Sequence, residues 1–369
     1  MTINEGEALE YRVGNVAFCQ GYLSRRRIPV RQVFYPDRVD VSDIDVLGIR
    51  FDSNFGKHMA LWECKAGLAD GTVDRILWLL GLSQYSKAEF KGIVRPKVPD
   101  RVKLFATSMG VEVWDYEVLA HNEKIFGAAS PIGYNNPTVY YQREIDNYRT
   151  IRDVDRLSKA YWYLKATFWF EPAETRIKRT LTAISYCQEE VNSLKKEIAQ
   201  AAKDLLCEGM VLTSVAVLDF AGQLSSWRAT SHLKEQVSQR LTSGLGTEAE
   251  RNEIIQAALE YTTAMKGAKA RRTPPTPLQV PPPKYTEPLV DLMDRFYERP
   301  TVAQRVPRLL DLLTYESIIP GKEVDKSRVK LFFGEDVEIL AKMSKNVVTF
   351  LERATGFPTE VVESGFRML

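Results

Sequence analysis

Residues 61–67 read Leu-Trp-Glu-Cys-Lys-Ala-Gly, which sets a carboxylate and an amine two positions apart inside an otherwise apolar run. The run predicts a strand over residues 58–66, and the side-chain period of two places Glu63 and Lys65 on one face. Charged side chains in an apolar strand are costly unless they have partners or a chemical role. The sheet around this strand must therefore supply partners on that face.

A partner strand is predicted just upstream, over residues 41–51, where Asp43 and Asp45 share one face. Residues 52–57 have the composition of a hairpin loop, so the two strands are expected to pair antiparallel and bring Asp45 close to Glu63. Glu10 lies on an amphipathic helix predicted over residues 6–24, and it adds a third acid if that helix packs over the same edge. The sequence thus predicts acids gathered around Lys65.

Such a cluster suits a hard divalent cation bound through oxygen. Two or three carboxylates are enough for Mg²⁺, which keeps several of its waters. The ion would lower the pKa of a bound water and stabilise charge that develops on a phosphate. Lys65 would polarise the attacking water or hold a phosphate oxygen. The alternative for Glu63 and Lys65 is an ordinary ion pair on a solvent-facing sheet.

The totals exclude several other classes of protein. The chain has 369 residues, of which 44% are hydrophobic, enough for two or three domains. The net charge of +2 neither demands nor excludes nucleic acid as a partner. No apolar run reaches about 18 residues, so no membrane span is predicted, and the acidic first nine residues lack the apolar core of a secretory signal. Four scattered cysteines and three histidines favour a reducing cytoplasm and argue against a histidine-ligated metal.

The order of predicted elements indicates a mixed sheet with helices on its faces. After the hairpin come an apolar helix over 72–91, a short strand over 91–94, a buried strand over 102–107 and a last strand over 111–115. This is one α/β domain of about 120 residues. Residues 125–152 are predicted to be an irregular connector because they hold glycines and an Asn-Asn-Pro turn.

The rest of the chain is predicted to be helical. A heptad stripe, Ile177, Ile184, Val191, Ile198 and Leu205, predicts one long helix, either in the core or in an intermolecular coiled coil. Six prolines within 274–283 indicate a semi-rigid spacer, and residues 286–369 return to helical patterns.

The order of helix with Glu10, strand with Asp43-Ile44-Asp45, hairpin and strand with Glu63-Cys64-Lys65 resembles the PD-(D/E)XK nuclease superfamily. The likeness is to Mrr-type restriction enzymes and archaeal Holliday-junction resolvases, over about residues 5–116. It implies a restriction-endonuclease-like α/β fold and phosphodiester hydrolysis that needs Mg²⁺ or Mn²⁺ and leaves a 5′-phosphate. It also implies metal ligation by Asp45, Glu63, the Cys64 backbone carbonyl and Glu10, with Lys65 catalytic.

The likeness gives a nuclease-like domain (1–122), and composition and periodicity divide the rest into a connector (123–152), a helical domain (153–272), a Pro-rich linker (273–285) and a C-terminal helical domain (286–369). For some of the family's site positions, more than one residue of this chain is a candidate. Asp43 is a rival to Asp45, and Glu7 to Glu10. Pro36-Asp37 matches the family's Pro-Asp literally, but Asp37 sits in a turn-like stretch. Gln84 matches a glutamine that several members carry, or bonds locally in its helix.

Basic residues near the predicted site would neutralise phosphates. The candidates are Arg25, Arg26, Arg27, Lys87 and Lys91, with Gln84; the alternative is a solvated basic face. The first hypothesis is a cytoplasmic metal-dependent endonuclease of restriction or anti-phage defence type, acting on DNA in preference to RNA. The second is a catalytically silent nuclease-fold subunit that binds nucleic acid or scaffolds an assembly. The helical two thirds would form a homodimer or larger assembly, select the target, or dock a partner protein.

Overall fold

The computed structural model describes residues 3–34, 37–67, 71–228, 230–244, 253–255, 257–258 and 281–366, with the backbone alone for 32–34 and 37–40. Within these residues a five-stranded sheet has the order β1–β2–β3–β4–β5. The strands are β1 (Leu23–Phe34), β2 (Asp37–Phe51), β3 (Lys57–Cys64), β4 (Phe90–Val94) and β5 (Glu112–Trp114). The first three pair antiparallel, and β3, β4 and β5 are parallel. The predicted mixed sheet with flanking helices is confirmed.

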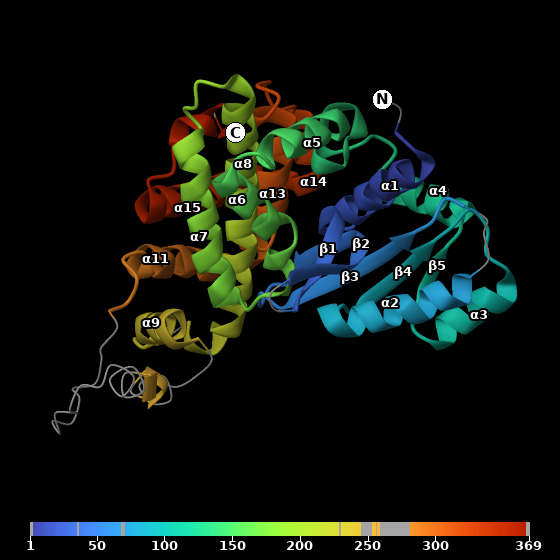
Figure 1. The fold of residues 1–369 in the computed structure, drawn as a ribbon, viewed down its shortest axis with the longest axis horizontal. Helices are drawn as coiled ribbons and strands as arrows, with labels where there is room; N and C mark the ends of the chain where they lie inside the picture. The colour runs from blue at the N-terminus through green and yellow to red at the C-terminus, as the bar shows by residue number, and fades with distance from the viewer. Residues whose placement is uncertain are drawn as a thin grey trace.

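Two pairs of helices cover the two faces of the sheet (Figure 1). Helices α1 (Glu5–Cys19) and α4 (Tyr116–Ile125) lie on one side, and α2 (Thr72–Ser86) and α3 (Asp100–Ser108) on the other. Trp62 belongs to the apolar cluster that contains the α1 residue Val13, whereas Leu61 belongs to the cluster that contains Ile76 of α2. Alternate residues of β3 thus face opposite helix layers, as the period of two predicts.

The helix over residues 6–24 is shorter than predicted. Asn4 begins it with a reciprocal cap, in which its side chain accepts from the Glu7 backbone and Glu7 accepts from the Asn4 backbone. The helix ends at Cys19, and Gly21 then turns the chain into β1 with a φ of 97°. The side chain of Glu10 therefore lies in the middle of a well-capped helix.

The prediction of a strand over 102–107 is wrong, because this segment is helix α3. Pro99 stands at the N-cap, and Asp100 lies in the first turn. Ala106 packs inside, while Leu104 is 72% exposed, so the segment is amphipathic with a helical period and lacks the fully buried run expected of a parallel strand. The tyrosine and proline of the predicted turn at 35–36 lie outside the described residues.

Residues 125–152 are irregular only up to Asn136, and the rest of the segment is helical. After a 3₁₀ turn (Gly133–Asn135), Asn136 caps helix α5 (Pro137–Ile151), whose first residue is the proline. An asparagine followed by proline suits the start of a helix, because the fixed φ of proline is helical and its missing N–H needs no partner there. The composition of this segment is typical of an irregular connector and also of the start of a helix, and packing against α8 favours the helix.

The heptad stripe does not form one long helix. It spans α7 (Ala173–Glu190) and α8 (Lys196–Gln223), with Val191 at the end of the first and a turn before the second. Ile184 of α7 and Gly209 of α8 pack so closely that a Cβ on Gly209 would lie 2.8 Å from the isoleucine. The two helices form a hairpin, and Leu194 is fully exposed in its turn.

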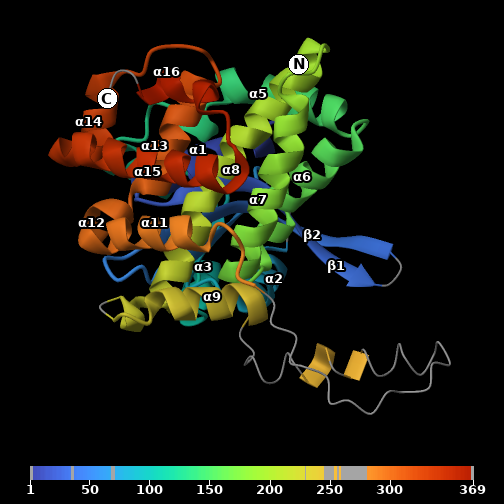
Figure 2. The same ribbon diagram turned by 90° about the vertical axis from the view of Figure 1, so that its left-hand side faces the viewer.

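The remaining helices surround α8 (Figures 1 and 2). They are α6 (Asp155–Lys165), α9 (Leu233–Ser243), α11 (Thr286–Glu298), α12 (Pro300–Ala303), α13 (Val306–Leu313), α14 (Lys326–Phe333), α15 (Val337–Thr355) and α16 (Glu363–Phe366). One helix, α8, is long and apolar enough to cross a membrane, but 89% of its apolar window is buried against this chain, as in the core of a soluble protein.

One apolar cluster runs from Leu61 of the sheet through Leu212 of α8 to Leu309 of α13 and Leu351 of α15. The core is therefore continuous across the predicted domain boundaries, and the division into segments stays a prediction. The Pro-rich spacer lies outside the described residues except for 281–285.

Gly222 of α8 is the closest point between this helix and the β2–β3 hairpin. A Cβ there would lie 2.4 Å from the Phe55 carbonyl oxygen, a backbone atom that cannot swing away. We expect Gly222→Ala to lower the free energy of unfolding by about 1–3 kcal/mol, the usual cost of overpacking. Urea unfolding measures this. Gly6→Ala is the matched control, because its Cβ would meet only ordinary contacts; equal stability of Gly222→Ala and wild type would contradict the expectation.

Candidate functional site

The structure brings together the three residues around which the sequence prediction was built. The Lys65 Nζ atom lies 3.3 Å from Asp45 Oδ2 and 3.2 Å from Glu63 Oε1. The register of β2 and β3, in which Val46 pairs with Trp62, places the two acids side by side on one face. The Cys64 backbone N–H donates to Asp45 Oδ2 at 2.7 Å and fixes that carboxylate against β3.

Burial sets the charge properties of this trio. Asp45 and Glu63 are almost fully buried, whereas Lys65 is partly exposed. Burial raises the pKa of Asp45, and the Lys65 ammonium opposes the rise. Burial and then repulsion from Asp45 raise the pKa of Glu63. Burial alone would lower the pKa of Lys65, but the two carboxylates outweigh it and the pKa is raised. The acids thus gain from any further positive charge placed beside them.

Arg75 also contacts the trio. It lies in the first turn of α2, and its NH1 atom is 3.4 Å from Glu63 Oε1 while half of its side chain stays exposed. Sequence reasoning missed it because that reasoning followed strand faces, and Arg75 comes from the next helix. A basic residue in the first turn of the helix after Glu-Cys-Lys was the available signal. Lys65 and Arg75 together form an exposed basic rim above buried acids.

Arg27 holds the acids of α1. Its Nε atom lies 2.9 Å from Glu10 Oε2, and its NH1 atom 2.7 Å from Glu7 Oε1. Arg27 is left out of the β1–β2 ladder between Arg26–Val46 and Ile28–Ile44, which sets it opposite Asp45, and it has a φ of 53°. Such a left-handed residue is rare outside glycine and marks a local distortion of the strand.

Glu10 and Glu7 therefore have different surroundings. Burial raises the pKa of Glu10, Arg27 opposes the rise, and the Asp45 charge adds to it, so Glu10 lies within electrostatic reach of the trio. Glu7 is occupied by its role in the helix cap and by a hydrogen bond from Tyr141 of α5. Of the two candidates on α1, Glu10 is the one that faces Asp45.

The other predicted residues lie elsewhere. Asp43 is exposed on β2, and the side chain of Asp37 lies outside the described residues. Gln84 and Lys87 are exposed, and Lys91 is half-buried on β4. The Cys64 side chain points to the opposite face, where burial raises the pKa of the thiol strongly and keeps it protonated.

Arg25 and Arg26 do not form a nucleic-acid surface, contrary to the prediction, because both are buried and paired. Arg25 donates to both oxygens of Glu208 on α8 at 2.7 and 2.8 Å, and its NH1 atom lies 2.7 Å from Asp311 Oδ1 on α13. Arg26 lies over the Tyr11 ring and 3.6 Å from Glu144 of α5. The three consecutive arginines thus contact different helices: Arg25 contacts α8 and α13, Arg26 contacts α1 and α5, and Arg27 contacts α1.

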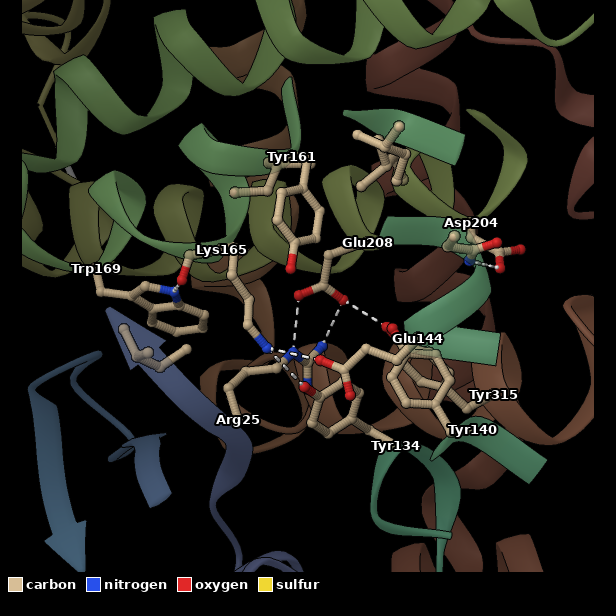
Figure 3. A pocket seen from close by; sticks show the side chains of 15 residues that line it. Arg25, Tyr134, Tyr140, Glu144, Tyr161, Lys165, Trp169, Asp204, Glu208 and Tyr315 are labelled. Carbon is tan, nitrogen blue, oxygen red and sulfur yellow. Dashed lines mark hydrogen bonds and ion pairs between the residues drawn. The ribbon is translucent and has the colours of Figure 1, made fainter. Parts of the chain in front are cut away.

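A cavity of about 50 Å³ lies beside Arg25, between the sheet and the helices (Figure 3). In this view the side chains of Lys165, Glu144 and Glu208 converge on the arginine. Lys165 Nζ donates to Glu144 Oε1 at 2.9 Å and to the Arg26 carbonyl oxygen at 3.0 Å. The charges that line the cavity are thus satisfied by one another, and the cavity wall fixes the backbone that leads to Arg27.

The donor set can be tested against a divalent cation. Among the described residues, no group of three histidine, cysteine or acidic side chains lies close enough to hold a metal. Two carboxylates completed by water, however, are a usual set for Mg²⁺. Glu63 Oε1 is buried and has no hydrogen bond of good geometry, although two cations lie within ion-pair distance. An acceptor of this kind beside a second carboxylate fits a hard cation.

Comparison with models of protein families, with curated proteins and with solved structures finds no match to this chain.

Proposed function

We propose that this chain is a metal-dependent endonuclease that hydrolyses phosphodiester bonds in DNA, of restriction or anti-phage defence type and acting in the cytoplasm. The observation that carries the proposal is the contact of one lysine with two buried carboxylates from adjacent antiparallel strands. The parallel strand β4 and helices on both faces complete the arrangement that the PD-(D/E)XK resemblance implies. The charge pattern, buried acids below an exposed basic rim, suits a polyanion that approaches from solvent.

The roles follow from position. Asp45 and Glu63 would hold Mg²⁺ or Mn²⁺, with the Cys64 carbonyl and Glu10 as further ligands. When bound, the ion would acidify a water and neutralise charge on the phosphate. Lys65, between the two acids, orients the attacking water or donates to a non-bridging phosphate oxygen. Arg75 and Arg27 hold flanking phosphates of the backbone.

The test is a panel of substrates: supercoiled plasmid, linear duplex, single-stranded DNA and RNA, each with Mg²⁺, Mn²⁺ or EDTA. We expect metal-dependent cleavage of DNA with 5′-phosphate ends, and loss of cleavage in Asp45→Ala and Glu63→Ala. Undiminished cleavage by both variants would sink the site assignment. No cleavage of any substrate with either metal would remove the enzyme proposal.

A second candidate is a silent nuclease-fold scaffold. It is favoured by one observation: each acid already has a cation beside it, with Lys65 and Arg75 at Glu63 and Arg27 at Glu10. A crystal soaked with Mn²⁺ separates the two. Anomalous density between Asp45 and Glu63 supports the enzyme, whereas retention of the ion pairs supports the scaffold.

Metal binding predicts a gain in stability. The raised pKa of Asp45 and Glu63 means that their ionised forms are disfavoured in the folded chain, and a bound cation relieves that cost. At about 100 times its Kd, Mg²⁺ or Mn²⁺ should add about 2.7 kcal/mol to the free energy of unfolding. Thermal unfolding with metal or EDTA measures this. Asp45→Asn should lose the gain, while Asp153→Asn, on an exposed surface, should keep it; equal gains in both variants would contradict the site.

A further inference from the structure

The outer face of α2 is apolar although it is exposed. The buried side of this helix is formed by Ile76, Leu79 and Leu82. On the opposite side, Leu77 is 50%, Trp78 41% and Tyr85 51% exposed. The helix lies on the outer side of the sheet (Figure 1), and near its C-terminal end Tyr85 packs against Phe170, with ring centroids 5.2 Å apart. Large apolar side chains in one stripe at helical spacing are unusual on a monomer surface and mark a contact with another molecule.

A groove of about 230 Å³ runs along this stripe. Val30 and Val41 of the β1–β2 hairpin line one side of it, and Trp78 and Tyr85 the other. The backbone of the hairpin projects beyond the helical body (Figure 2). With Val41 and Val73 included, the exposed apolar side chains amount to on the order of 400 Å², which is the size of the largest apolar patch on a typical monomer, and such a patch is often functional.

Gly81 lies at the centre of the stripe. A glycine inside a helix costs stability relative to alanine, because it adds backbone freedom to the unfolded chain. Packing within the part of the chain that the structure describes does not require it, since a Cβ on Gly81 would meet no atom there within 4 Å. Because glycine has no side chain, the helix backbone is accessible at Gly81 between Leu77, Trp78 and Tyr85, and a second helix can approach it closely.

The charges at the two ends of α2 indicate that the second helix is α2 of another copy of this chain. Asp74 is exposed in the first turn, and Lys87 is exposed at the C-cap. Neither has an ion-pair partner in the part of the chain that the structure describes. If a second α2 crosses antiparallel at Gly81, Asp74 of each copy comes within reach of Lys87 of the other. The opposed helix dipoles also favour this direction.

We propose that the outer face of α2 is the contact between two copies of this chain, packed antiparallel across a two-fold axis at Gly81. The arrangement is isologous. The two Gly81 residues meet on the axis, the apolar side chains beside each glycine pack against the other copy, and Asp74 and Lys87 form two equivalent ion pairs. The hairpin arms extend the contact beyond the helix pair. Arg75, which contacts Glu63, lies on the same helix. The two-fold axis therefore places the acids of the two copies on either side of one contact. The inference does not depend on the proposed function.

The test measures the mass of the full chain in solution as a function of concentration. We expect a reversible dimer, and Gly81→Arg should weaken dimerisation at least tenfold while leaving the melting temperature of the chain unchanged or higher. Leu104→Arg, an exposed apolar residue on α3, is the matched control and should dimerise as wild type does. A wild-type chain that stays monomeric, or a Gly81→Arg chain that dimerises normally, overturns the proposal.

Two further variants test the direction of packing. Asp74→Lys and Lys87→Asp should each weaken the dimer, and the double variant should restore it, because the pairs re-form with their signs exchanged. Gly81→Cys should form a disulfide between two copies on oxidation, since residue 81 meets itself across the axis. Failure of both the charge rescue and the cross-link, with an intact dimer, would place the contact elsewhere.

Discussion

The proposed nuclease activity predicts that Lys65→Ala cleaves DNA about 10²–10³-fold more slowly than the wild-type chain, which is the usual loss when one donor to a developing oxyanion is removed. The structure gives the reason for so large an effect. Lys65 contacts both Asp45 and Glu63, and it stays partly exposed, so its ammonium can reach a phosphate. The loss should appear in kcat more than in KM, because the interaction strengthens as charge develops.

The measurement is single-turnover cleavage of labelled duplex, with saturating metal. Lys342→Ala, an exposed lysine on α15, is the control and should be as active as wild type. Lys65→Arg tests geometry, because it keeps the charge and changes the shape of the donor. Cleavage by Lys65→Ala at the wild-type rate would assign the chemistry to other residues.

Arg25→Met is expected to lower the free energy of unfolding by about 3–5 kcal/mol, the cost of breaking a buried ion pair by removing one partner. Arg25 is buried between Glu208 and Asp311, and its loss leaves the buried Asp311 and the partly buried Glu208 without this counter-charge. Urea unfolding near neutral pH measures the effect. Arg149→Met, an exposed arginine on α5, should change stability by less than about 0.5 kcal/mol.

The ion pair between Arg25 and Asp311 also makes the free energy of unfolding depend on pH. Burial raises the pKa of Asp311 to about 6 even with Arg25 in place. A raised carboxyl pKa means that the folded chain prefers the protonated form, so this contribution to stability is present below the ordinary pKa and is lost as pH rises through about 6. Without Arg25 the pKa should rise further. The deficit of Arg25→Met should therefore shrink as pH falls toward about 5, and a deficit that grows on acidification would contradict this account.

The central part of the site could be predicted because it depends on local rules. Glu63 and Lys65 share a face by strand period, and a short hairpin pairs β2 with β3 so that Asp45 lies beside Glu63. Alternation also predicted that Leu61 and Trp62 lie in different cores. These statements need only a few residues of chain and the geometry of an antiparallel pair.

The rest depends on contacts between distant parts of the chain. The basic run at 25–27 has the composition of a phosphate-binding surface, but Glu208 and Asp311 that bury Arg25 come more than 180 residues later. Arg75 reaches Glu63 only because of where α2 starts after the loop. The heptad spacing continues across the turn between α7 and α8, although no single helix spans it. Residues 102–107 form a helix and not a strand because of which of their side chains pack against the sheet.

The three arginines of β1 also determine how far the chain can be shortened. A fragment that ends at residue 122 would hold every acid proposed to act in chemistry. It would also keep Arg25 and Arg26 while losing Glu208, Asp311 and Glu144, their counter-charges. Two guanidinium groups would then sit on the strand next to Asp45 without the ion-pair partners that bury them in the whole chain. The residues of the proposed site all lie in the first third of the sequence, but the charges that hold β1 in place come from the helices that follow.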